Sequence, residues 1–209
     1  MTSATDPAAT TTATTATTAD AAAAAATDSA GTGRRITAGL FMSLDGVVEA
    51  PETWHFPYLN EEMGAVVGGL AAAADTLLLG RRTYETFAAT WPQQTGDMAD
   101  ALNAIPKLVV STTLDKAEWN NSTVLSGDLV AELTDLKRRP GRDISLSGSI
   151  MLTRSLLRAG LIDDLHLLVH PIVLGSGIRL FTEQDRIPLQ LAHAATFRTG
   201  VVHLHYRQA

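Results

Sequence analysis

The stretch "RDISLSGSIMLTRSLLRAGLIDDLHLLVHPIVLG", residues 142–175, constrains the fold of this chain more than any other. It begins as a strand that ends near residue 148, continues as a helix between Ser149 and Gly160, and returns to one long strand that is interrupted or bent at Pro171. Serine before the first helical turn and glycine after the last are favoured helix boundaries. A strand, a helix and a strand in this order predict two parallel strands joined by a covering helix.

The same alternation of strand and helix patterns runs through the rest of the chain. Strand-like apolar runs occur in "RRITAGLFMS", "DTLLL" and "KLVVST", and helix patterns with acidic starts occur in "NEEMGAVVGGLAAAA" and "GDLVAELTDLKRRPG". Residues 189–209 divide at Thr199-Gly200 into two alternating strands, which is typical of an antiparallel hairpin. We therefore expect an α/β fold of three layers, in which a mostly parallel mixed sheet carries helices on both faces and a C-terminal antiparallel hairpin at its edge.

Residues 1–33 differ in composition from everything that follows. They are almost entirely Ala and Thr and contain no large apolar side chain after Met1, so they cannot bury enough surface to offset the entropy of ordering them. We predict a disordered tail over residues 1–33 and one folded domain over residues 34–209.

Export and membrane insertion are not indicated by the sequence. Arg34-Arg35 resembles the start of a twin-arginine export signal, but Asp45 and Glu49 interrupt the apolar stretch that such a signal needs. No run approaches the roughly 20 apolar residues of a membrane span. We expect a cytoplasmic protein that does not bind membranes.

Charge and cysteine content exclude further classes of function. The formal net charge of -6 offers no basic surface for nucleic acid. The absence of cysteine excludes disulfides, cysteine-ligated zinc and thiol nucleophiles. His166 and His170, like His203 and His205, would share strand faces at even spacing, but no third ligand accompanies them in a recognisable pattern, so we predict no metal site.

Polar groups suited to an anion follow three of the predicted strands, namely Gly80-Arg81-Arg82-Thr83, Ser111-Thr112-Thr113 and Ser147-Gly148-Ser149. In an open α/β sheet, ligands bind beyond the carboxyl ends of the strands, where helix N-termini present unpaired N–H groups. Hydroxyls, a glycine-led turn and guanidinium groups would together cradle a diphosphate and a separate phosphate, which is the shape of NADPH. Two alternatives stay open: Ser-Gly-Ser is also an ordinary turn and helix cap, and the arginines can pair with Glu85 or Asp75.

Three segments resemble, in the same order, the cofactor-binding segments of dihydrofolate reductase: "DTLLLGRRTYETF", "KLVVSTTL" and "SLSGSIMLTRSLLRAGLIDDLHLLVHPIVLGSG". With "SLDG" at 43–46 and "PxxLGxG" at 171–177, the chain is more similar still to stand-alone bacterial proteins built like the C-terminal reductase domain of bifunctional riboflavin-biosynthesis enzymes. The resemblance spans about residues 35–207. It implies a dihydrofolate reductase-like fold, a homodimer, and NADPH-dependent hydride transfer to a small heterocycle such as 5-amino-6-(5-phosphoribosylamino)uracil or a pterin. A non-catalytic nucleotide-binding protein that keeps this scaffold is the alternative.

The resemblance also implies a set of cofactor contacts. They are Leu40, Phe41 and Val48 along the nicotinamide, Gly80, Arg81 and Thr83 at the diphosphate, Arg81 or Arg82 with Ser111 and Thr112 at the ribose phosphate, and Gly148, Ser149 and Ile150 at the diphosphate beside the helix start. The chain departs from the riboflavin-pathway pattern in two places. Val47 stands where a basic residue is usual, and Ser147-Gly148-Ser149 stands where Glu-Gly-Gly is usual.

The substrate side is expected in the loop "VVEAPETWHFPYLNEE", residues 47–62. Trp54 and Phe56, with the neighbouring His55 and Tyr58, would stack on a flat heterocycle or merely cap the core. Asp45 is the candidate proton donor or substrate anchor, although Asp-Gly is also a common turn pair. Glu62, like Glu61, lies roughly where dihydrofolate reductases carry the carboxylate that faces the pterin.

Overall fold

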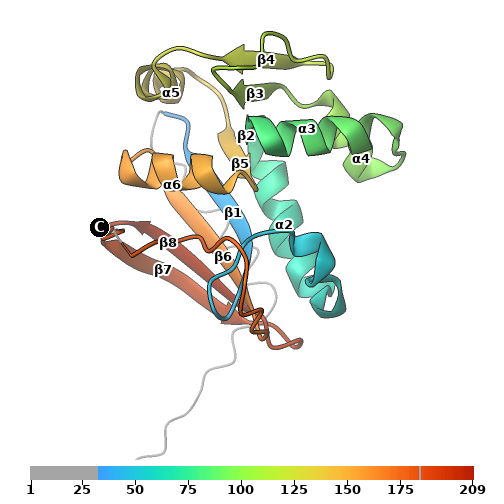
Figure 1. The fold of residues 1–209 in the computed structure, drawn as a ribbon, viewed down its shortest axis with the longest axis vertical. Helices are drawn as coiled ribbons and strands as arrows, with labels where there is room; N and C mark the ends of the chain where they lie inside the picture. The colour runs from blue at the N-terminus through green and yellow to red at the C-terminus, as the bar shows by residue number, and fades with distance from the viewer. Residues whose placement is uncertain (1–32, 184) are drawn as a thin grey trace, which may run out of the picture.

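A computed structural model describes residues 33–183 and 185–209. The predicted disordered tail, residues 1–33, lies outside the described residues except for Gly33. In the described part, one sheet of eight strands forms the centre of the molecule and helices pack against it (Figure 1). The predicted α/β architecture is confirmed.

The strands of the sheet follow the order β4-β3-β2-β5-β1-β6-β8-β7. Neighbours from β4 to β6 are parallel, whereas β8 pairs antiparallel with both β6 and β7, which confirms the mixed sheet and its C-terminal hairpin. The strands are β1 Ile36–Ser43, β2 Ala74–Gly80, β3 Lys107–Val110, β4 Ser122–Leu125, β5 Asp143–Ser147, β6 Asp164–His170, β7 Leu189–Thr196 and β8 Val202–Gln208.

Helices cover both faces of the sheet because successive residues of a strand point to opposite sides. On one face, Leu78 of β2 packs with Leu133 and Leu156, and on the other Leu77 packs with Tyr84. The helices are α2 Glu61–Ala73, α3 Arg81–Thr90, α4 Asp97–Ala104, α5 Leu129–Arg138 and α6 Ile150–Arg158, with short 3-10 helices η1 Pro51–Thr53, η2 Phe56–Tyr58 and η3 Trp91–Gln93. Leu133 and Leu156 belong to α5 and α6, so these two helices form one layer, and α3 belongs to the other.

Local capping explains where several helices begin and end. The Asn60 side chain accepts a hydrogen bond from the Met63 N–H and starts α2, as the sequence predicts. The Asp128 side chain caps α5 in the same way. Gly160, with φ +70, follows α6 in the left-handed conformation that ends many helices.

The helix α4 and the strand β4 are not predicted from the sequence, whereas the predicted interruption at Pro171 is confirmed. The unpredicted α4 and β4 are short, and β4, "STVL", has too few apolar residues to show a strand period. The long strand predicted after Gly160 ends at His170, because Pro171 lacks the N–H that a further strand residue would donate. Among the helices of the described ranges, none is long and apolar enough to cross a membrane.

Candidate active site

The two turns that leave β2 and β5 touch each other at the carboxyl edge of the sheet. The Gly80 N–H donates a hydrogen bond to Ser149 Oγ at 2.8 Å, and the Ser149 N–H donates to Thr83 Oγ1 at 3.0 Å. Parallel pairing of β2 with both β5 and β3 places the three predicted anion-binding segments side by side. The structure therefore brings these segments together, and cofactor binding by them stays a prediction.

The turn between β5 and α6 has a backbone shape suited to an anion. Gly148 and Ser149 both have positive φ, of 59° and 50°. Successive residues with left-handed backbone can turn their N–H groups toward one side and form a concave anion site. The expected helix cap at Ser149 is wrong in its chemistry, because its hydroxyl accepts from Gly80 and makes no side-chain cap hydrogen bond to α6.

The two arginines at the start of α3 differ in their surroundings. Arg81 Nε donates to Glu85 Oε1 at 2.7 Å, and one terminal nitrogen donates to Thr113 Oγ1 at 2.6 Å. The Glu85 alternative is therefore realised, whereas Asp75 pairs with Arg34. Arg82 is exposed and makes no ion pair within the described residues. A guanidinium held at the mouth of β3 and a second one facing solvent both suit a phosphate.

The segment after β3 has one buried hydroxyl residue, Ser111, and two exposed ones, Thr112 and Thr113. Ser111 Oγ accepts from the N–H groups of Thr113 and Leu114 at 3.2 and 3.0 Å and so holds this turn in shape. Thr112 is exposed. Thr113, which the resemblance left out of the cofactor contacts, orients Arg81 together with Glu85.

The residues predicted to meet the nicotinamide have mixed exposure. Leu40 and Val48 are each 5% exposed and belong to the main core cluster. Phe41, on the opposite face of β1, is partly buried and is therefore the most accessible of the three. Ile150, the first residue of α6 and a predicted diphosphate contact, is also partly buried.

Asp45 ties two loops together at the end of β1. Its carboxylate accepts from Ser43 Oγ at 2.7 Å and from the N–H groups of Leu174 and Gly175 at 3.1 and 2.9 Å. The Ser43 hydroxyl, followed by these N–H groups, lowers the pKa of Asp45 to about 2. Near neutral pH this carboxylate has no proton to donate, so of the two roles predicted for Asp45 the geometry favours an anchor over a proton donor.

Glu62 has a similar bracing arrangement at the start of α2. Its Oε2 accepts from the Arg198 N–H at 2.8 Å and from the Asn60 side chain at 2.7 Å. The Arg198 N–H is the largest cause that lowers the pKa of Glu62. The carboxylate links α2 to the turn between β7 and β8, and contact with a substrate stays a prediction.

An aromatic cluster fills the space between β1, β6 and the loop before α2. Trp54 is 7% exposed and lies edge-on to His170, with ring centroids 5.1 Å apart. His55 stacks on Phe41 at 4.5 Å. Phe56, in contrast, is 60% exposed. Of the predicted substrate residues, Trp54 thus packs in the cluster while Phe56 faces solvent.

The remaining strand histidines interact mainly with one another. His166 Nδ1 lies 2.9 Å from His203 Nε2, and His205 Nε2 lies 2.7 Å from Asp164 Oδ1. His166 and His205 stack with centroids 4.2 Å apart. In the described ranges, no group of three or more His, Cys, Asp or Glu residues is arranged to hold a metal ion.

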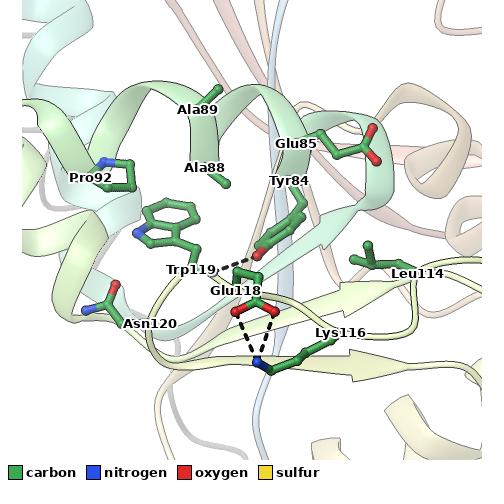
Figure 2. Close-up of a pocket in the computed structure, with 10 residues that line it drawn as sticks. All are labelled: Tyr84, Glu85, Ala88, Ala89, Pro92, Leu114, Lys116, Glu118, Trp119 and Asn120. Carbon is green, nitrogen blue, oxygen red and sulfur yellow. Dashed lines mark hydrogen bonds and ion pairs between the residues drawn. The ribbon is translucent and has the colours of Figure 1, made fainter.

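An open groove of about 550 Å³ lies outside this edge, between α3 and residues 114–120 (Figure 2). Tyr84 and Trp119 lie next to each other in its lining, and the Trp119 backbone N–H donates to the Tyr84 hydroxyl at 2.9 Å. Lys116 and Glu118 pair at its rim. None of the predicted cofactor or substrate residues lines this groove.

The profile of the RibD C-terminal domain family matches residues 34–203. The chain belongs to this family. A relative from Bacillus subtilis, the protein YyaP, is 29% identical over 182 residues, which cover 83% of this chain and 94% of YyaP. Membership places the chain among proteins related to the reductase half of riboflavin-biosynthesis enzymes, as its motifs imply.

Solved structures show the same fold at low sequence identity. The riboflavin biosynthesis reductase Rib7 of Saccharomyces cerevisiae is 18% identical, with a TM-score of 0.57 over 88% of this chain and 94% of Rib7. Dihydrofolate reductase of Enterococcus faecalis, solved with NADP(H), is 16% identical, with a TM-score of 0.56 over 83% of this chain and 96% of that enzyme. The predicted dihydrofolate reductase-like fold is confirmed, and this RibD C-terminal domain protein is related to reductases.

The sequence does not indicate the individual contacts of two residues of the site. In the sequence pattern, Thr113 is only one member of a run of hydroxyls suited to an anion, and His170 is only a possible metal ligand. The signal for His170 was its place at the last position of a strand beside Pro171. Its environment depends on the loop at residues 50–59, and no local pattern links the two.

Proposed function

We propose that the chain is an NADPH-dependent reductase acting on a small heterocycle. One observation carries the proposal: turns that leave neighbouring parallel strands present a guanidinium, hydroxyls and a glycine-led backbone at a single edge. Arg81, Thr83 and Gly148 represent these three kinds of group. A dinucleotide with a separate ribose phosphate matches this combination of donors.

The residues present fit such a cofactor. The left-handed backbone at Gly148 and Ser149 can direct N–H groups to a diphosphate, and Arg81 or Arg82 can pair with the ribose phosphate. Bound NADPH would supply the hydride, and the protein supplies alignment and exclusion of water. Asp45 remains ionised and holds the loop at the end of β1 in place.

The substrates proposed for testing are 5-amino-6-(5-phosphoribosylamino)uracil and a pterin. Both contain a flat ring system with N–H groups, which suits the aromatic loop beside β1. The family also supports a homodimer, and NADPH use supports a place in the cytoplasm.

Fluorescence titration with NADPH and NADH tests whether the protein binds the cofactor. The absence of tight binding of either would contradict the reductase proposal.

A second function is favoured by one specific observation. Trp54, His55 and Tyr58 pack around a fully buried His170, where a substrate would otherwise be admitted. A non-catalytic nucleotide-binding protein would keep this space filled. Binding of NADPH without its oxidation across pterins, pyrimidines and quinones would support that alternative.

A further inference from the structure

The aromatic cluster at the ends of β1 and β6 contains two imidazoles with unpaired nitrogens. His170 is fully buried and pairs with Ser43 in the parallel register of β6 and β1, so it lies at the same sheet edge as the proposed cofactor site. His55, which is 9% exposed, belongs to the loop that leads from β1 to α2. His170 Nε2 and His55 Nδ1 are both buried and make no hydrogen bond within the described residues.

Hydrogen bonding fixes the tautomer of His170. Its Nδ1 lies 2.8 Å from the Leu168 carbonyl oxygen, and a carbonyl can only accept. Nδ1 therefore carries the hydrogen, and the unpaired Nε2 presents a lone pair. Burial, the largest cause, lowers the pKa of His170 and keeps the ring neutral. The buried Nε2 is thus an acceptor without a donor, and this unsatisfied group destabilises the observed packing of the aromatic cluster.

His55 occupies a stacking position on Phe41. The two rings lie 4.5 Å apart and 11° from parallel. Phe41 is a β1 residue on the face that also carries His170, and the two rings meet edge-on at 5.5 Å. The His55 ring also lies perpendicular to that of His170, with centroids 6.3 Å apart, so a flat ring in the place of His55 on Phe41 would lie beside His170.

The loop that carries His55 is attached to the rest of the protein mainly by ring contacts. Within the described residues, the hydrogen bonds of residues 51–59 join partners inside residues 49–59, including Trp54 Nε1 to the Glu49 carbonyl. Ala50, at the start of the loop, has φ +43, a conformation that strains a non-glycine residue. The loop can move away from Phe41 without breaking a hydrogen bond to the sheet.

We propose that the His55 imidazole is a built-in plug: it occupies on Phe41 the stacking position of a flat heterocycle, whose edge N–H group donates to His170 Nε2 once the plug has moved. The inference rests on the proposed function and deepens it, because it places the flat heterocycle on Phe41 and requires an N–H donor at its edge. It also makes His170 the residue that selects for this donor.

Lumazine is a suitable probe, because it is a flat, fluorescent pteridine with ring N–H groups. Titration of the full chain with lumazine compares wild type with His55→Ala. Removal of the plug should tighten lumazine binding by about fivefold or more. Unchanged or weaker binding would overturn the proposal, since a ring that merely clamps the ligand from above would lose affinity on truncation.

His193→Ala is the matched control. His193 also has a buried, unpaired Nε2, but it lies on β7 beside His203 and away from Phe41. Its removal should leave lumazine affinity unchanged. An equal gain of affinity in both variants would show a general loosening of the protein and would contradict a specific plug.

The donor requirement is tested with 1,3-dimethyllumazine, which keeps the ring but lacks both N–H groups. In the His55→Ala variant, lumazine should bind about fivefold or more tightly than its dimethyl analogue. Adding His170→Phe to this variant should reduce the ratio of the two affinities to near one. A ratio near one in His55→Ala itself overturns the donor contact, even if the His170 variant does not fold.

The lumazine titration and the NADPH titration test the two proposals independently. Lumazine is titrated in the absence of NADPH, and NADPH is titrated against the same variants. If wild type binds no NADPH but lumazine follows the expected order, the reductase proposal fails and the plug stands. If NADPH binds and the lumazine order fails, the plug is wrong and the reductase proposal stands.

Discussion

Arg81 and Arg82 are adjacent in sequence, yet the structure gives them different states. Two hydrogen bonds, to Glu85 and Thr113, fix the direction of the Arg81 guanidinium, while Arg82 faces solvent. A side chain that is already held loses less conformational entropy when it binds a phosphate. At the scale of single residues, orientation rather than charge distinguishes the two.

Replacing both arginines, in Arg81→Ala with Arg82→Ala, should weaken NADPH binding by about 2–4 kcal/mol. Of the single variants, Arg81→Ala should lose more, because its guanidinium is preorganised. The affinity for NADH should fall much less than that for NADPH if the arginines contact the ribose phosphate. The two affinities should fall equally if the contact is to the diphosphate. Fluorescence titration measures both cofactors. Arg138→Ala, an exposed arginine of α5 paired with Asp135, removes the same charge elsewhere, and NADPH affinity equal to that of this control would refute the contact.

Asp45→Asn should lower the melting temperature, because the carboxylate anchors Leu174 and Gly175 as an ionised acceptor. The folded-state pKa is lowered to about 2 from the usual 3.8, so this stabilisation is present above the unfolded value and is lost as pH falls through about 2. Thermal melts of both proteins across acidic pH measure the difference. A melting-temperature gap that widens on acidification would contradict the role of the ionised form.

At the scale of elements, the residue that precedes α6 forms a hydrogen bond to the end of the neighbouring strand β2 and does not cap its own helix. Asn60 and Asp128 cap their own helices, as their positions in sequence indicate. Ser149 occupies the equivalent position before α6, but its hydroxyl oxygen accepts a hydrogen bond from the Gly80 N–H at the end of β2. The left-handed backbone at residues 148 and 149 makes this long-range contact possible.

Gly148→Ala should destabilise the fold by about 1–2 kcal/mol, because φ at this position is +59 and a Cβ would lie 3.2 Å from Thr83 Cγ2. Gly68→Ala is the control, since Gly68 lies within α2 with open space around it. That change should be stabilising by up to about 1 kcal/mol through helix propensity. Urea unfolding measures both, and equal effects of the two substitutions would exclude strain at Gly148.

At the scale of the whole molecule, the join between the parallel sheet and its hairpin contains buried histidines. Burial, the largest cause, lowers the pKa of His166 to about 3 and that of His203 to about 4. The Asp164 carboxylate, near these histidines, pairs with Arg35, His205 and Arg207. Both neutral rings must stay unprotonated for the sheet to pack.

Acidification should therefore destabilise the protein well before its carboxylates titrate. The unfolded chain takes up protons at these histidines below about pH 6.5, whereas the folded chain resists, so stability falls as pH decreases from there. Between about pH 7.5 and about pH 5.5, the two groups predict a loss of about 3 kcal/mol in the free energy of unfolding. Urea unfolding at both pH values measures it. A free energy of unfolding that does not change with pH would show that both rings titrate normally. A pH dependence unchanged by His203→Gln would show the same for His203.

Much of the fold was predictable from the sequence because its signals are local. Apolar periods marked the main strands, Ser149 and Gly160 marked the boundaries of one helix, and Thr199-Gly200 marked the hairpin turn. The short α4 and β4 were missed, since neither is long enough to show a period. Part of the candidate site was also predictable, because the carboxyl ends of parallel strands share one edge whatever the details of packing.

The sequence by itself determined the class of fold and the residue types available at the carboxyl edge. Only the tertiary structure decided which of them interact: Ser149 with Gly80, Arg81 with Thr113, and His55 with Phe41. The physical reason lies in the range of the forces. Helix and strand preferences depend on neighbours a few residues away, whereas these contacts depend on strand order and on how the loop of residues 50–59 folds back over β1 and β6.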